Sequence, residues 1–178
     1  DKRDEAQKKM REVMAPISVP EFAAQAVADL KRCADYLLAD RNVTGRIAVM
    51  GFCFGGSYAY HLAAQDERIQ AAIPFYGQPP AAEEVGRINC PVLAFYGDQD
   101  ANLMQSLPAL RENMKNHGKT FEAVVYPGTG HAFFNDTNVR MHHPEYAKDA
   151  WQKTLAFLAQ AIGEAGVICA APSRWRSG

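Results

Sequence analysis

The sequence has no long apolar run, no excess of either charge and few cysteines. None of its apolar stretches approaches the ~20 residues that a membrane-spanning helix needs, and the charged start from Asp1 to Glu5 lacks the apolar segment of a signal peptide. The 19 Lys and Arg residues nearly balance the 20 Asp and Glu residues, so a net charge of -1 offers no broad basic surface to nucleic acid or an anionic membrane. These absences favour a cytoplasmic protein that binds neither nucleic acid nor a membrane.

The cysteines are too few and too scattered for a disulfide framework. They are Cys33, Cys53, Cys90 and Cys169, and no pair has the C-x-x-C spacing typical of zinc sites and redox motifs. We therefore expect free thiols in a reduced compartment, and no metal site.

What remains is an ordinary globular composition in 178 residues, of which 48% are hydrophobic and 22% are charged. A chain of this length typically forms a single domain. The last helical pattern ends at Gly163, so we expect one domain over residues 1–163 and an irregular tail over residues 164–178.

Helix-like and strand-like patterns alternate along this domain. Helical patterns cover residues 1–15, 22–38, 55–64, 103–117 and 144–163, and short apolar runs typical of buried strands cover 46–51, 71–76, 91–96 and 121–126. Pro74 interrupts the second of these runs, and proline cannot donate to a strand ladder. The alternation predicts an α/β fold with a mostly parallel sheet flanked by helices.

A glycine-rich turn joins the first predicted strand to the helix that follows it. It places Cys53 between Gly51 and Gly55, with Gly56 next. A side chain at the tip of so sharp a turn needs small neighbours two positions away, and the pattern is that of a nucleophile elbow with cysteine where serine is usual. The positive end of the helix favours a thiolate, and the backbone N–H of Phe54 is a candidate oxyanion-hole donor. The alternative is that Cys53 is a small buried hydrophobe, as most free cysteines are.

A nucleophile of this kind needs a histidine base and an acid that orients the histidine. Asp100 follows the strand predicted at 91–96, and His131 lies in the glycine-rich loop after the strand predicted at 121–126. The C-terminal ends of parallel strands share one edge of a sheet, so both side chains can meet Cys53 there. Their order along the chain is the nucleophile, acid and histidine order of α/β-hydrolases.

Other residues compete for these two roles. Asp98 is close enough to Asp100 in sequence to serve as the acid. The other histidines are His61, His117, His142 and His143. Only His131 follows a strand in a glycine-rich loop, whereas the others lie on or beside predicted helices. A metal site made of His131, His142 and His143 has poor spacing and no cysteine or carboxylate to complete a tetrahedral set.

Three motifs carry a family resemblance, and they are residues 51–56 around the cysteine, 96–100 around the acid and 126–133 around the histidine. Together with the helical segment 150–158 they resemble the dienelactone hydrolases, or carboxymethylenebutenolidases. The similarity runs from about Arg11 to Ile162. The cysteine elbow is the discriminating motif, since elbows with serine occur throughout the α/β-hydrolase superfamily.

The resemblance implies an α/β-hydrolase fold and hydrolysis of an enol-lactone or a related ester of a small molecule. Cys53 would be the nucleophile and His131 the base. Asp100 rather than Asp98 would orient the histidine, because the family places its aspartate three residues after a glycine, here Gly97. Thiolate attack would give an acyl-enzyme, which water then cleaves with help from His131. No metal and no organic cofactor is implied.

The chain departs from the family ahead of the elbow. α/β-Hydrolases place further strands there, and a loop with the second oxyanion-hole N–H. Only helical sequence precedes Arg46, so we expect a domain that lacks its N-terminal strands, together with a glutamate that contacts the resting cysteine in the family. A sheet without those strands would expose an apolar edge that invites aggregation or a partner.

The chain also departs from the family at the substrate-binding arginines. Family members that act on dienelactone carry an arginine four residues beyond the histidine, where this chain has the neutral Asn135. Arg11 lies at the distance of a second family arginine, and a charge on a solvated helix face explains it equally well. These positions argue against dienelactone itself as the substrate and leave ester or lactone hydrolysis as the expected reaction.

Two other functions fit the same residues. The fold and the three candidate residues would also serve a thioesterase, a carboxylesterase or a peptidase, because specificity lies in pocket residues that no motif labels. A non-catalytic remnant that acts as an interaction domain is favoured by the missing strands. The intact elbow, Asp100 and His131 argue against a non-catalytic remnant.

Overall fold

A computed structural model describes residues 4–5, 8–9, 12–13, 15–17 and 19–163 of the chain. Its elements in order are η1 (Ala15–Ile17), α2 (Pro20–Ala39), β1 (Ile47–Phe52), α3 (Phe54–Gln65), β2 (Ile69–Phe75), α4 (Ala82–Val85), β3 (Val92–Gly97), α5 (Ala101–Asn116), β4 (Phe121–Tyr126) and α6 (Pro144–Ile162). Arg11 and the tail predicted over 164–178 lie outside the described residues. In the described part of the chain, no helix has the length and apolar character needed to cross a membrane.

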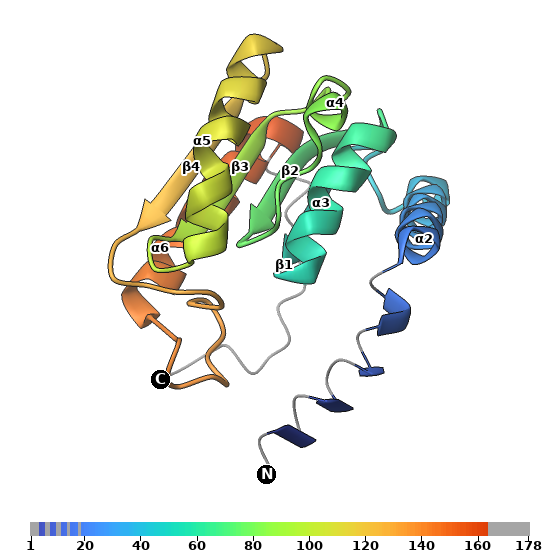
Figure 1. Ribbon diagram of the computed structural model, residues 1–178. Coiled ribbons are helices and arrows are strands. Elements are labelled where there is room, and N and C mark those ends of the chain that lie inside the picture. Colours follow the sequence, from blue (N-terminus) through green and yellow to red (C-terminus); the bar gives the residue numbers. More distant parts are fainter. Residues whose placement is uncertain (1–3, 6–7, 10–11, 14, 18, 164–178) are drawn as a thin grey trace.

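The four strands form one parallel sheet in the order β1-β2-β3-β4. In Figure 1, α3 and α5 lie in front of the sheet and α6 lies behind it, so helices cover both faces, while α2 packs beside α3. All four predicted strands and the four longer helices predicted after residue 20 are present with small shifts at their ends, and the α/β fold is confirmed. The short α4 was not predicted, because its four residues are too few to show a helical period.

Proline occupies a central strand of this sheet. Pro74 lies within β2, between β1 and β3, although proline is usually confined to edge strands. Within β2, the Ala72 N–H donates to the Pro91 carbonyl at 3.1 Å, and just after β2 the Tyr76 N–H donates to the Phe95 carbonyl at 2.7 Å. Pro74 stands midway between these two donors, so the N–H that it lacks is one that would point toward β3. The strand therefore survives the loss of one ladder bond, because the bonds on both sides of it are made.

The burial of the strands follows their place in the sheet. Every residue of β3 is buried, as a continuous apolar run in a parallel sheet predicts. At the edge formed by β1, Met50 is 40% exposed and Phe52 is 36% exposed. The edge strand β1 therefore exposes apolar residues next to the predicted elbow.

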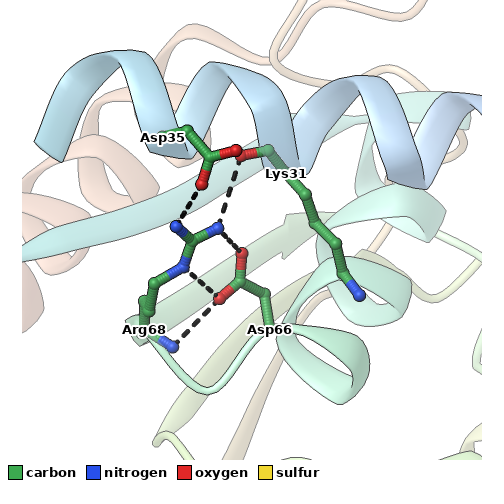
Figure 2. Close-up of polar contacts among 4 residues, drawn as sticks. All are labelled: Lys31, Asp35, Asp66 and Arg68. Atoms are coloured by element: carbon green, nitrogen blue, oxygen red, sulfur yellow. Dashed lines mark hydrogen bonds and ion pairs between the residues drawn. The ribbon is translucent and has the colours of Figure 1, made fainter. Parts of the chain in front are cut away.

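An ion-pair network attaches α2 to the turn between α3 and β2 (Figure 2). The carboxylate of Asp66, a residue that is 6% exposed, accepts hydrogen bonds from Arg68 Nε at 2.8 Å and from Arg68 Nη2 at 2.6 Å. The same guanidinium donates to the Asp35 carboxylate and to the Lys31 carbonyl oxygen, both on α2. The hydrogen bonds from Arg68 outweigh the burial of the carboxyl and hold the pKa of Asp66 below its usual value.

Asp66→Asn is expected to lower the free energy of unfolding by about 1 to 2 kcal/mol near pH 7, because a neutral amide replaces a charged acceptor that faces Arg68. A carboxyl whose pKa is lower in the folded than in the unfolded protein stabilises the fold above the unfolded pKa of about 4. That contribution is lost as the pH falls through the folded pKa. Urea unfolding at about pH 7 and about pH 3 should therefore show the difference between wild type and variant shrinking at the lower pH.

The matched control is Asp29→Asn, which breaks an exposed ion pair with Arg32 within α2. Exposed pairs of this kind contribute little, so this variant should match the wild type at both pH values. If Asp66→Asn were equally destabilising at the two pH values, the charge of Asp66 would not be what holds Arg68 in place against α2.

Candidate active site

Cys53 lies at a sharp turn between β1 and α3. Its φ of 54° and ψ of -117° lie outside the conformations that a residue with a side chain ordinarily adopts. Its backbone N–H donates to the Phe75 carbonyl at 3.0 Å, and its carbonyl accepts from the Ser57 N–H at 3.2 Å, so the strained residue is held from both sides. The residue is exposed, which excludes the alternative that Cys53 is a buried hydrophobe.

The glycines around Cys53 do not all have the role predicted for them. A Cβ on Gly51 would lie 2.0 Å from the Gly55 carbonyl oxygen, and a Cβ on Gly56 would lie 2.5 Å from the Phe75 carbonyl oxygen. Gly51 thus allows the turn to close, and Gly56 lets α3 approach the sheet, as expected. A Cβ on Gly55 would meet nothing within 4 Å. The prediction that the turn needs a small residue at Gly55 is therefore wrong.

The structure brings the three predicted site residues together at the C-terminal edge of the sheet. His131 Nε2 lies 3.0 Å from Cys53 Sγ, and His131 Nδ1 lies 2.6 Å from Asp100 Oδ2. The Asp100 side chain, which directly precedes α5, is 11% exposed. When Nδ1–H is donated to this carboxylate, Nε2 is left as the nitrogen that can accept a proton from the thiol.

Hydrogen bonds connect the loop after β3 to the loop after β4, and the Asp98 side chain accepts one of them. Asp98 Oδ1 accepts a hydrogen bond from the Gly128 N–H at 2.8 Å, and the Gln99 N–H donates to the Thr129 carbonyl at 2.9 Å. A Cβ on Gly97 would lie 2.4 Å from the same Thr129 oxygen, so the two loops touch through their backbones. Of the two candidate acids, Asp98 holds the loop that carries the histidine, and Asp100 contacts the histidine itself.

Three of the four other histidines lie on or next to helices. His61 pairs with a carboxylate of α4 at 3.2 Å, His117 follows the last residue of α5, and His143 directly precedes α6. Among the described residues, no group of three or more His, Cys, Asp or Glu side chains is placed to hold a metal ion. The weakly spaced set of His131, His142 and His143 is therefore not assembled.

The other predicted site residues are Phe54, Asn135 and Arg11, and the structure describes the first two. Phe54 is the first residue of α3 and follows Cys53, so its N–H lies in the first turn, where helices leave N–H groups without intrahelical partners. Asn135 Oδ1 accepts hydrogen bonds from the Thr137 N–H at 3.1 Å and from the Thr137 hydroxyl at 2.7 Å, so this oxygen is occupied within its own loop. Arg11 lies outside the described residues.

Sequence reasoning missed Tyr76, which directly follows β2. Its φ is 38°, the residue is 4% exposed, and its ring centroid lies 4.9 Å from that of His131. The sequence pattern marks Tyr76 only as the end of a strand. A usable signal was its place at the C-terminal end of a parallel strand, where open α/β sheets bind their ligands.

Known proteins resemble this chain in sequence and in fold. The dienelactone hydrolase family matches residues 1–162 of the chain. A protein of Salmonella typhimurium named "Putative carboxymethylenebutenolidase" is 32% identical over 154 residues, which cover 80% of this chain and 57% of that protein. A protein of the same name from Saccharolobus solfataricus is 33% identical over 156 residues, covering 87% of this chain and 59% of that protein.

A solved structure agrees with the sequence relatives. The crystal structure of a "Putative Dienelactone Hydrolase" from Klebsiella pneumoniae has a TM-score of 0.73 to this chain and 32% sequence identity, and the match covers 78% of this chain and 62% of that one. The chain therefore spans between 57% and 62% of the length of the relatives described.

Proposed function

This chain belongs to the dienelactone hydrolase family, and on that premise we propose that it carries the catalytic centre of a hydrolase that cleaves a lactone or an ester of a small molecule. The observation that carries the proposal is the line of contacts from the Asp100 carboxylate through His131 to the Cys53 sulfur, at 2.6 and 3.0 Å. A carboxylate, an imidazole and a thiol in this order activate the sulfur as a nucleophile for acyl transfer.

In the first half of the proposed reaction, His131 Nε2 takes the thiol proton and the Cys53 sulfur attacks the carbonyl carbon of the substrate. A sulfur–carbon bond forms, and the carbonyl electrons move onto oxygen, where the Phe54 N–H at the start of α3 donates to the oxyanion. The bond to the leaving oxygen then breaks, and that oxygen receives the proton from His131. Asp100 stabilises the imidazolium that exists between these two proton transfers.

In the second half, water cleaves the acyl-enzyme. His131 removes a proton from the water, the hydroxide attacks the thioester carbonyl, and the sulfur leaves and regains the proton. The same three residues therefore act twice, and nothing besides the substrate and water enters the cycle.

An aromatic cluster that includes the neighbour of Cys53 and the ring beside His131 supports a small substrate with a flat apolar part. The ring of Phe52, which precedes the cysteine, lies 5.2 Å from the ring of Phe134 and 6.2 Å from that of Tyr76. Aromatic rings attract planar groups through their faces and edges. Unsaturated lactones and aryl esters are therefore the first substrates to try, with thioesters and peptides as the alternatives.

The proposal is tested by alkylating the folded protein with iodoacetamide and mapping the modified cysteines by mass spectrometry. We expect Cys53 to react fastest, because His131 generates the reactive thiolate, and we expect His131→Ala to slow that reaction by about tenfold or more. Cys90 is buried, and burial raises the pKa of its thiol to about 11, so it should not react. Cys33 is exposed, so its slower reaction serves as the internal reference.

Two outcomes would count against the proposal. One is a Cys53 that reacts no faster than Cys33, or whose rate is unchanged in His131→Ala. The other is an absence of turnover on a panel of unsaturated lactones, aryl esters and thioesters by a protein whose Cys53 is reactive. Preference for one member of the panel would separate a lactonase from an esterase or a thioesterase.

A further inference from the structure

Tyr76 has a backbone conformation that the sheet alone does not require. It follows β2 with a φ of 38°, in the left-handed region that a residue with a side chain rarely adopts. The next residue, Gly77, packs directly on the backbone of α3, because a Cβ on Gly77 would lie 2.3 Å from the backbone carbon of Gly56. The Tyr76 N–H is also bonded to β3, through the Phe95 carbonyl at 2.7 Å. Contacts on both sides thus maintain the strained backbone of Tyr76, and that backbone sets the direction of the Tyr76 side chain.

That side chain packs against the proposed catalytic histidine. The Tyr76 ring lies 4.9 Å from the His131 ring, at an interplanar angle of 58°, and it meets the Phe133 ring edge-on at 5.6 Å. Both contacts come from the loop that positions His131. The Tyr76 ring is therefore fixed beside the His131 ring.

The hydroxyl of Tyr76 has no hydrogen-bond partner within the described part of the chain, although buried tyrosine hydroxyls usually have one. The unpaired and fully enclosed polar side-chain atoms of the described residues are His143 Nδ1 and Thr154 Oγ1, so the Tyr76 hydroxyl keeps contact with solvent. A residue that is 4% exposed thus keeps a hydroxyl that no described residue binds, on a ring that packs against His131.

Burial, and to a smaller extent the charge of the Cys53 thiolate, raise the pKa of Tyr76 to about 12. At neutral pH the phenol therefore keeps its proton, and it can donate a hydrogen bond to an oxygen that gains negative charge. The influence of the Cys53 charge also agrees with a phenol close to the sulfur.

We propose that the Tyr76 hydroxyl donates a hydrogen bond to the leaving-group oxygen of the substrate while the acyl-enzyme forms. This inference rests on the proposed function. The sulfur–carbon bond forms, the carbon–oxygen bond breaks with its electron pair going to the leaving oxygen, and the proton on that oxygen comes from His131 Nε2. Tyr76 keeps its own proton and stabilises the oxygen as it becomes negative. In a lactone, this oxygen is the ring oxygen that becomes the enol or alcohol of the product.

The test is Tyr76→Phe, which keeps the ring contacts and removes only the hydroxyl. We would measure kcat/KM for a series of aryl and alkyl esters that differ in the acidity of the leaving alcohol. Poor leaving groups depend most on the donor, so their kcat/KM should fall by about 10- to 100-fold, the range for a hydrogen bond to a charged group. A nitrophenyl ester, whose leaving group needs little help, should change little. The dependence of rate on leaving-group acidity should therefore become steeper.

Three controls make the outcome decisive. Tyr146→Phe removes another tyrosine hydroxyl, from a ring stacked on His143, and should leave the whole series unchanged. The rate of Cys53 alkylation should be the same in Tyr76→Phe and wild type, because the contacts from His131 to Cys53 and Asp100 are retained. Fluorotyrosine at position 76, which keeps ring and hydroxyl but donates more strongly, should make the dependence shallower.

An equal fall for all esters, or no fall at all, would overturn the role of Tyr76. If Cys53 alkylation and turnover were normal in that case, the proposed function would stand without it. If turnover did not depend on Cys53 either, the proposed function itself would be wrong.

Discussion

Cys53→Ala is expected to lower kcat/KM for every ester and lactone that the protein cleaves by at least about 1,000-fold. The sulfur is the atom that bonds to the substrate, and alanine at the tip of the turn leaves nothing to replace it. The fold should be unaffected, because residue 53 is exposed and alanine tolerates a φ of 54° no worse than cysteine does. Initial rates on the best substrate of the panel, together with the unfolding midpoint, check both parts of this expectation.

The matched control is Cys33→Ala, which removes the other exposed thiol among the described residues, on α2. It should leave kcat/KM as it is. His131→Ala should cost about as much as Cys53→Ala, and the double variant should be little worse than either, because residues that act as one unit do not contribute additively. Two results would show that Cys53, His131 and Asp100 are not the nucleophilic centre. One is full activity in Cys53→Ala, and the other is a double variant whose loss of kcat/KM is the product of the two single losses.

The strands, their parallel direction and the meeting of the three residues could be predicted from the sequence. Buried parallel strands are apolar throughout, as the run that became β3 shows, and their C-terminal ends share one edge. Residues that follow two such strands, here Asp100 and His131, are therefore brought toward an elbow on a third. That step needs only the type and direction of the strands, which are strongly marked along the chain.

The choice between near neighbours could not be predicted from residue types alone. Asp98 and Asp100 are two residues apart, and what separates them is that the backbone of Gly128 comes within 2.8 Å of the first. Pro74 sits in a central strand because the bonds on either side of it are made. Both outcomes depend on contacts between distant segments, and for the two acids it is the family resemblance at Gly97, not the residue types, that selects Asp100.

The side chain of Tyr76 shows the same limit at the site itself. An aromatic residue at the end of a buried strand looks like a core residue in the sequence, and it is buried as expected. Its left-handed backbone, imposed where Gly77 packs on Gly56, turns the phenol toward His131. The direction of the Tyr76 side chain therefore depends on a close backbone approach between two glycines, and single glycines give no sequence signal of what they touch.

Gly51→Ala is expected to destabilise the protein by about 3 kcal/mol or more, a large part of the 5 to 15 kcal/mol that typically holds a domain folded. The new Cβ would lie 2.0 Å from the Gly55 carbonyl oxygen and 2.3 Å from its carbon. Both are backbone atoms of the first turn of α3, and that turn has little room to move because Gly56 already lies against β2. Urea unfolding of the variant and of wild type measures the loss.

Gly55→Ala is the matched control, since it adds the same methyl group four residues away, where nothing lies within 4 Å. Alanine is the better residue inside a helix, so this variant should equal the wild type or gain up to about 1 kcal/mol. Cys53 alkylation should be slowed in Gly51→Ala, because the turn that presents the sulfur to His131 can no longer close, and it should be normal in Gly55→Ala. Similar unfolding midpoints for the two variants would mean that the elbow yields easily, and that the position of Cys53 is fixed by its hydrogen bonds to β2 and α3 rather than by the packing of the glycines.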